Sequence, residues 1–128
     1  MNILFCGDAN AEDGVLITTL SLLKNSGAKD LHLYILTMEA HSDERKYQPF
    51  SKHAADYIRS LLIEANPKNT LELIDCTDLF LKEPPTANMN TRFTPYAMLR
   101  LFADELPQIP DRILYLDDDI AIRGDITA

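Results

Sequence analysis

Residues 113–116 read Ile-Leu-Tyr-Leu and are followed at once by three aspartates at residues 117–119. Four apolar residues in a row that end abruptly in charge are typical of a short buried strand. An exposed turn rarely follows so apolar a run, so we expect the aspartates to lie at the carboxyl end of a strand inside a sheet. The rest of the chain supplies the other strands of that sheet.

Strands and helices are predicted to alternate along the chain. The predicted strands are residues 2–6, 31–36, 71–74 and 113–116. The predicted helices are residues 13–25, 43–66 and 95–106. Ser42 is the expected N-cap of the second helix, and the Pro-rich and Asn-rich stretch at residues 82–90 is expected to be a loop. This alternation predicts an α/β fold with a parallel sheet and helices on both faces.

Composition excludes several classes of protein. The chain has 128 residues and a formal charge of −8, from 12 Lys and Arg against 20 Asp and Glu. We expect one domain. We expect no nucleic-acid partner, because proteins that bind nucleic acids normally carry a surplus of basic residues. No apolar run reaches the roughly 18 residues of a membrane span, and no basic stretch precedes the apolar N-terminus, so we expect neither a transmembrane segment nor a secretory signal. Two cysteines, Cys6 and Cys76, are read as small buried side chains without a disulfide.

The acidic run is a candidate metal site. In an extended chain Asp117 and Asp119 project to one side, with Cα atoms roughly 6.5–7 Å apart, and Asp118 projects to the other. Two carboxylates that converge repel each other, and a hard divalent cation such as Mn²⁺ or Mg²⁺ would remove that repulsion. Such a cation would also admit a diphosphate to a chain with net charge −8. The alternative is a solvated acidic turn.

Two other polar residues accompany this run. Asp8 follows the first predicted strand, and parallel strands present their carboxyl ends at one edge of the sheet. Arg100 lies between apolar residues on the predicted third helix, where a guanidinium is held by a carboxylate or a phosphate, or else extends over the surface. Neither a Walker loop nor a GxGxxG motif is present, so the common phosphate-binding loops are missing.

Three segments together resemble family 8 glycosyltransferases. Tyr-Leu-Asp-Asp-Asp at residues 115–119, continued by Gly-Asp at residues 124–125, resembles the YLDxD signature of that family. Leu-Arg-Leu at residues 99–101 resembles its helix with an Arg-Leu pair, and residues 3–10 resemble its first strand and D-x-N loop. The resemblance spans essentially the whole chain.

The resemblance implies a Rossmann-like GT-A fold with a mostly parallel sheet. Residues 1–128 would be the nucleotide-sugar-binding portion of one domain, truncated after the DxD strand. The implied reaction moves a hexose from a UDP-sugar donor to a glycan or lipid-linked acceptor, such as lipopolysaccharide or another surface glycan, with retention of configuration. Asp117 and Asp119 would bind Mn²⁺ or Mg²⁺ at the diphosphate. A cytoplasmic location is expected, peripheral to the membrane in the full-length protein.

The remaining site residues take their roles from the same resemblance. Asp8 and Asn10 would hold the uracil or ribose, Asp118 would lie near the ribose, and Arg100 would contact the sugar or diphosphate. The sequence departs from the family at Ala11, where an aromatic residue is common. The family's later histidine ligand and Lys-Pro-Trp motif are absent, so these 128 residues alone are expected to be inactive.

Three other interpretations stay open at this point. Haloacid-dehalogenase-like phosphatases also place a DxD after a buried strand, but they follow it with Gly-Thr or a similar pair, and here Ile-Ala stands at residues 120–121. A non-catalytic, truncated nucleotide-sugar-binding module is the second. A calcium loop is the third, although Gly124 is misplaced for it and its twelfth position is Ala128 rather than glutamate.

Overall fold

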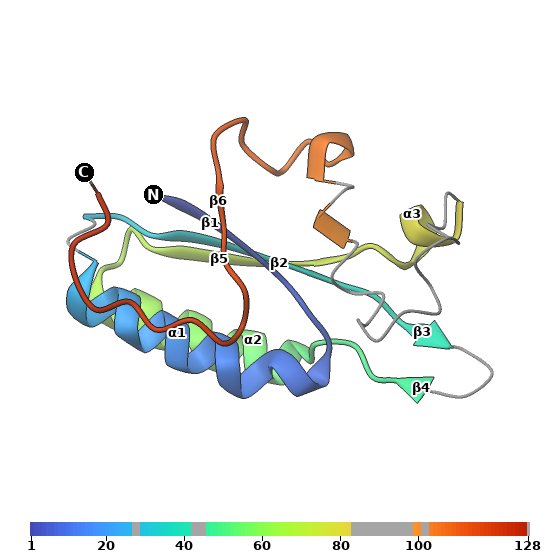
Figure 1. Cartoon of the computed structure of the whole chain (residues 1–128), viewed down its shortest axis with the longest axis horizontal. Helices are drawn as coiled ribbons and strands as arrows, with labels where there is room; N and C mark the ends of the chain where they lie inside the picture. Colours follow the sequence, from blue (N-terminus) through green and yellow to red (C-terminus); the bar gives the residue numbers. More distant parts are fainter. Residues whose placement is uncertain (27–28, 42–45, 83–98, 101–102, 128) are drawn as a thin grey trace.

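The computed structural model describes residues 1–26, 29–41, 46–82, 99–100 and 103–127 of the chain (Figure 1). Its main sheet consists of four parallel strands, β1 (Asn2–Cys6), β2 (His32–Thr37), β5 (Thr70–Asp75) and β6 (Leu114–Tyr115). The spatial order is β5-β2-β1-β6. The predicted parallel sheet is therefore confirmed, and all four predicted strands are present, with β6 shorter than expected.

One face of the sheet is covered by two helices, α1 (Glu12–Asn25) and α2 (Lys52–Ala65) (Figure 1). Apolar side chains from both helices and from the sheet form one core, which includes Phe5, Val15, Leu33 and Ile58. Each such buried side chain contributes about 1.5–3 kcal/mol of transfer free energy. None of the helices in the described part of the chain is long and apolar enough to cross a bilayer.

A second, smaller core lies on the opposite face. Leu4 and Leu36 of the sheet pack there with the buried Leu99. The short helix α3 (Thr77–Lys82) adds Leu79 to this core. The expectation of helices on both faces is thus confirmed, although α3 itself was not predicted.

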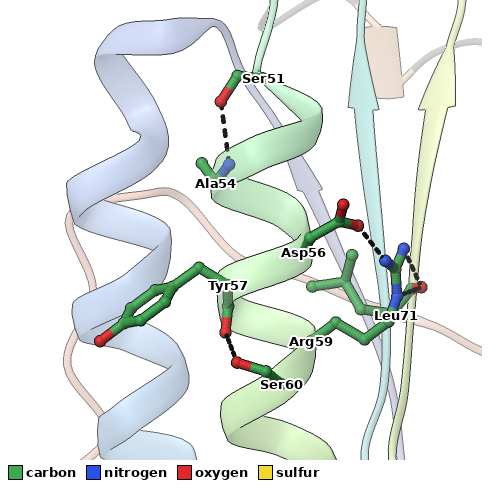
Figure 2. Close-up of polar contacts among 7 residues, drawn as sticks. All are labelled: Ser51, Ala54, Asp56, Tyr57, Arg59, Ser60 and Leu71. Atoms are coloured by element: carbon green, nitrogen blue, oxygen red, sulfur yellow. Dashed lines mark hydrogen bonds and ion pairs between the residues drawn. The ribbon is translucent and has the colours of Figure 1, made fainter.

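Helix α2 begins later than the sequence pattern predicts. The predicted helix starts at residue 43, whereas the observed one starts at Lys52, after the N-cap Ser51, whose Oγ accepts a hydrogen bond from the Ala54 amide at 3.0 Å (Figure 2). The expected N-cap Ser42 lies outside the described residues. The stretch before Ser51 forms instead the short strand β4 (Lys46–Tyr47), which pairs with β3 (Ala40–His41). Proline interrupts helices, and Pro49 makes an isolated bridge to Asp8.

Arg59 ties α2 to the sheet. Its Nε and Nη2 each donate a hydrogen bond to the carbonyl oxygen of Leu71 at 3.1 Å (Figure 2). Its Nη1 pairs with Asp56 one turn earlier on the helix. The guanidinium therefore fixes the outer strand β5 against α2.

The predicted helix at residues 95–106 falls largely outside the described residues, as does most of the predicted loop at residues 82–90. Within that predicted helix, the described residues 103–105 form a 3-10 turn rather than an α-helix. After β6 the chain forms no regular element in its described part, but it runs along α1 (Figure 1). That course was not predicted.

Candidate functional site

The strand order creates a ligand-binding edge beside β1. The chain passes from β1 to β2 on one side and on to β5, and then returns across the sheet to place β6 on the other side of β1. In open α/β sheets ligands bind beyond the carboxyl ends of the strands at such a switch point. Asp8 follows β1 there, and Asp117 follows β6. The two acidic features predicted from separate ends of the sequence therefore meet at one edge.

Asp8 and Asn10 are held together in one tight turn. The side chain of Asp8 is 7% exposed and caps the 3-10 turn η1 (Ala9–Ala11), with Oδ1 accepting from the Asn10 amide at 3.1 Å. The amide nitrogen of the Asn10 side chain lies 3.5 Å from Asp8 Oδ2. Asp8 thus orients the exposed Asn10 as well as shaping its own loop.

The segment before α2 supports this turn. The Ala9 amide donates to the Gln48 carbonyl at 2.9 Å, and the Ser51 amide donates to Oε1 of Glu12 at 2.8 Å. Both contacts lie between stretches that are distant in sequence. Sequence reasoning missed this support because it placed the segment inside a helix.

Side chains alternate between the two faces of the sheet, as expected, from Tyr115 to the start of the acidic run. Tyr115 packs on the face of the second core, and Leu116 is buried in the core beneath α1 and α2. Asp117 acts electrostatically on Tyr115, and Asp118 lies against α1 at Gly14. Residues 118–119 form a turn, so the extended geometry assumed for the whole run ends there. The common side of Asp117 and Asp119 stays a prediction.

Arg100 lies beside the acidic run. Its guanidinium carbon is 5.5 Å from the centroid of the Tyr115 ring, within the range of a cation–π contact. The same positive charge lowers the pKa of Cys6 and of Tyr115, whereas the negative charge of Asp117 raises both. The structure therefore brings Arg100 and Asp117 into one neighbourhood, as the predicted site requires.

Neither thiol nor phenol at this edge ionises near neutral pH. Burial raises the pKa of Cys6 to about 12, and nearby Cys76 adds to the effect. Burial likewise raises the pKa of Cys76 to about 11 and that of Tyr115 to about 12. Both cysteines are free thiols, and Cys76 is buried as predicted, whereas Cys6 is only partly buried. These groups are protonated and so are poor nucleophiles.

The pKa of Asp118 responds to the negative charges around it. Partial burial raises the pKa of its carboxyl above the usual aspartate value, while a hydrogen bond with its own backbone acts in the opposite direction. The charges of Asp119, Asp117 and Asp8 raise it further. Carboxylates from both strand ends therefore repel the charge of Asp118, which is a condition that favours a bound cation.

The donor set fits a hard divalent cation only in part. Asp117 and Asp119 are exposed and offer oxygen ligands, the type that Mg²⁺ and Mn²⁺ prefer. Within the described stretches of the chain, however, no group of three or more His, Cys, Asp or Glu side chains is arranged to hold a metal ion. The two aspartates would need further ligands from the substrate, from water or from residues beyond that group.

Two glycines at this edge were missed by sequence reasoning. A Cβ atom at Gly14 would lie 1.9 Å from the carbonyl oxygen of Asp118, and one at Gly7 would lie 2.5 Å from the Cβ of Ala11. For Gly14 the available signal was its place early in a helical pattern, where glycine costs roughly 1 kcal/mol relative to alanine and therefore indicates a packing reason. The buried Ala11 is turned to the core rather than to the edge.

A separate cavity lies at the other end of the sheet. It has a volume of about 720 Å³ and opens at the amino ends of the strands, where Met1, Asn2, Arg112 and Leu114 contribute to its lining. The acidic residues lie at the opposite ends of β1 and β6. We place the site at the carboxyl edge because the titratable groups and the switch point coincide there.

Solved structures of other proteins share this fold. Two crystal structures of the galactosyltransferase LgtC superpose on the chain. One, a complex with donor and acceptor sugar analogues, gives a TM-score of 0.70 at 21% identity over 99% of this chain. The other, the active-site mutant Q189E, gives a TM-score of 0.71 at 20% identity over 99% of this chain. Their likeness establishes the GT-A fold that the sequence predicted.

The sequence comparisons bear on the family of the chain as well as on its fold. The lipopolysaccharide 1,2-glucosyltransferase of Escherichia coli strain K12 is 29% identical over 129 residues, or 99% of this chain. The chain spans 33% of that relative's length and 41% and 40% of the two LgtC chains. The family model for glycosyl transferase family 8 matches residues 2–128. With its motifs, its strand order and this match in agreement, the chain belongs to glycosyltransferase family 8.

Proposed function

We propose that residues 1–128 form the nucleotide-sugar-binding portion of a metal-dependent, retaining glycosyltransferase. The proposed reaction moves a hexose from a UDP-sugar to a glycan or lipid-linked acceptor, with lipopolysaccharide or another surface glycan as the favoured class. Family membership and the lipopolysaccharide glucosyltransferase relative support this assignment. Family membership also favours transfer over the haloacid-dehalogenase-like alternative.

One observation carries the proposal: carboxylates from both strand ends lie near enough to the switch point beside β1 to act on the charge of Asp118. Asp8 reaches it from β1, and Asp117 reaches it from β6. An acidic edge repels a nucleoside diphosphate, so it becomes a nucleotide site only in the presence of a cation. Mn²⁺ or Mg²⁺ is the cofactor that oxygen ligands select.

Asp117 and Asp119 would hold this cation. When bound, the ion supplies Lewis-acid stabilisation of the diphosphate leaving group. Arg100, which the Tyr115 ring positions beside Asp117, would contact the sugar or the diphosphate and share in neutralising its charge. Both interactions act where negative charge develops during transfer.

The D-x-N loop would bind the nucleoside. Asn10 is exposed and oriented by Asp8, so its amide can hydrogen-bond uracil or ribose while Asp8 keeps the turn closed. Asp118 would lie near the ribose, where its backbone is fixed against α1. Ala11 is buried, so it supplies no stacking surface for the base.

Retention of configuration is part of the proposal, without a dedicated protein nucleophile. Cys6 and Tyr115, the thiol and phenol of this edge, have pKa values of about 12 and are protonated at neutral pH. Their role is therefore packing and orientation rather than attack on the sugar.

Calorimetry on the whole protein tests this function. UDP should bind in the presence of Mn²⁺ and lose that metal-dependent binding in Asp117→Ala and in Asp119→Ala. Asp111→Ala is the matched control, since this exposed aspartate precedes β6 and so lies towards the amino ends of the strands. A donor screen that scores UDP release then identifies the sugar. Metal-independent UDP binding that survives both substitutions would refute the proposal, and binding without transfer would indicate a non-catalytic module.

A further inference from the structure

The segment after the acidic run is fastened to α1 by three side chains of that helix. Thr18 Oγ1 lies 2.5 Å from the carbonyl oxygen of Ile120 and donates to it. Ser21 Oγ accepts from the Ile122 amide at 2.8 Å, and Asn25 Nδ2 donates to the Ile122 carbonyl at 2.8 Å. Figure 1 shows this segment following the length of the helix.

These side chains form one stripe with Gly14. The four positions of this docking stripe are Gly14, Thr18, Ser21 and Asn25. Spacings of four, three and four residues place them on a single face of an α-helix. Every member is small or polar, so the stripe receives a backbone that lacks regular structure and satisfies its polar groups.

Gly14 sets the closest approach. A Cβ atom there would lie 1.9 Å from the carbonyl oxygen of Asp118 and 3.0 Å from its carbonyl carbon. The obstructing atoms belong to the backbone, so a side chain at position 14 could not be accommodated by a change of rotamer. The acidic turn would have to move away from α1.

Thr18 supplies the next attachment. It is fully buried, and its single hydroxyl proton lies between two acceptors, the Gly14 carbonyl at 2.9 Å and the Ile120 carbonyl at 2.5 Å. Ile120 directly follows Asp119. The hydroxyl therefore fixes the chain one residue beyond the acidic run, while Gly14 fixes it within the run.

We propose that Gly14 and Thr18 are positioning residues for the acidic run. They hold the backbone of residues 118–120 at a set distance from α1, and so place Asp117 and Asp119 for a divalent cation and the diphosphate it accompanies. The inference rests on the proposed function. Partners that orient metal ligands typically matter 10–100-fold for metal affinity.

The test compares variants of the whole protein that differ in one group. Thr18→Val removes the hydroxyl but keeps the branched shape, Thr18→Ser restores the hydroxyl, and Gly14→Ala adds a single methyl group. Gly124→Ala is the matched control, because a Cβ atom there meets nothing within 4 Å. Mn²⁺ affinity is measured by calorimetry with UDP present, and amide exchange of residues 116–123 is measured in the metal-free protein.

We expect Gly14→Ala and Thr18→Val to weaken Mn²⁺ binding by about 10–100-fold. Amide exchange of residues 116–123 should become about tenfold faster in both, with Thr18→Ser and Gly124→Ala close to wild type. Wild-type Mn²⁺ affinity and exchange in folded Gly14→Ala and Thr18→Val would overturn the inference, even if both melt at a lower temperature. A wild-type protein that binds no Mn²⁺ even with UDP present would refute the proposed function instead, and the exchange data would still decide the positioning role.

Discussion

Asp118 combines two constraints in one residue. Its carbonyl group lies against Gly14, and its carboxyl group, on a residue that is exposed overall, is partly desolvated close to Asp119, Asp117 and Asp8. The first constraint fixes the backbone, and the second makes the ionised side chain costly. A negative charge that is held in place among other negative charges lowers the stability of the metal-free fold.

This cost has a definite dependence on pH. Because the folded-state pKa of Asp118 is raised above its ordinary value of 3.8, its contribution to stability is fully present below that pH and is lost as the pH rises through the folded value. Asp118→Asn stays neutral throughout. In EDTA we therefore expect the variant to melt above wild type at pH 7 and with wild type at pH 3, by circular dichroism.

Asp125→Asn provides a control of opposite sign. Hydrogen bonds from the hydroxyl and the amide of Thr127 lower the pKa of Asp125, so its contribution is present above the ordinary pKa and is lost as the pH falls through the folded one. This variant should melt below wild type at pH 7. An Asp118→Asn protein that melts below wild type at pH 7 would contradict the repulsion argued above.

At the scale of elements, the strands were predictable and the start of α2 was not. Within β2, residues 33–36 are Leu-Tyr-Ile-Leu, and a buried parallel strand leaves such a nearly continuous apolar run in the sequence directly. Helix α2 begins where Ser51 caps it, whereas the apolar spacing extends upstream through Tyr47 and Phe50. Phe50 is buried, but from a non-helical segment, and periodicity alone does not distinguish the two cases.

The cap itself makes a measurable prediction. Ser51→Ala removes the acceptor for the Ala54 amide and should lower the free energy of unfolding by about 1 kcal/mol in urea titrations. Ser60→Ala is the same substitution inside the same helix (Figure 2), at an exposed site where Ser60 Oγ donates to the Tyr57 carbonyl. Alanine is the better helix former, so this change should be neutral or stabilising by up to about 0.5 kcal/mol. Equal losses in both variants would show that the cap does not start α2.

The sequence led to the edge where the candidate residues lie, and their roles stay predictions, whereas the contacts that support them were not predictable. Asp8, Arg100 and Asp117 follow from strand ends and from the family resemblance, and the structure brings them together. The contacts that hold them, such as Thr18 to Ile120, join residues about a hundred positions apart. A single sequence carries no periodic signal for such a contact, and only the small residue at position 14 hinted at it.

At the scale of the whole molecule, residues 1–128 surround the site with a net charge of −8. A uniformly acidic surface repels a nucleoside diphosphate over a distance set by the ionic strength, about 10 Å at 0.1 M salt. The acidic edge beside β1 adds a local repulsion of the same sign. Without a cation, the site therefore favours an uncharged nucleoside over a nucleotide. A bound divalent cation reverses this preference, so that the nucleotide binds more tightly.

This reversal separates a metal-dependent site from a preformed phosphate site. In EDTA we expect the whole protein to bind uridine more tightly than UDP, because only UDP carries the repelled charge. Raising NaCl from about 0.02 M to about 0.2 M shortens the screening length about threefold and should strengthen the weak UDP binding while leaving uridine unchanged. With Mn²⁺ the order should invert, and the same salt should weaken UDP binding, since attraction is now screened. UDP binding in EDTA that exceeds uridine binding and falls with salt would place a positive phosphate cradle at this edge, and the acidic run would then have no part in holding the diphosphate.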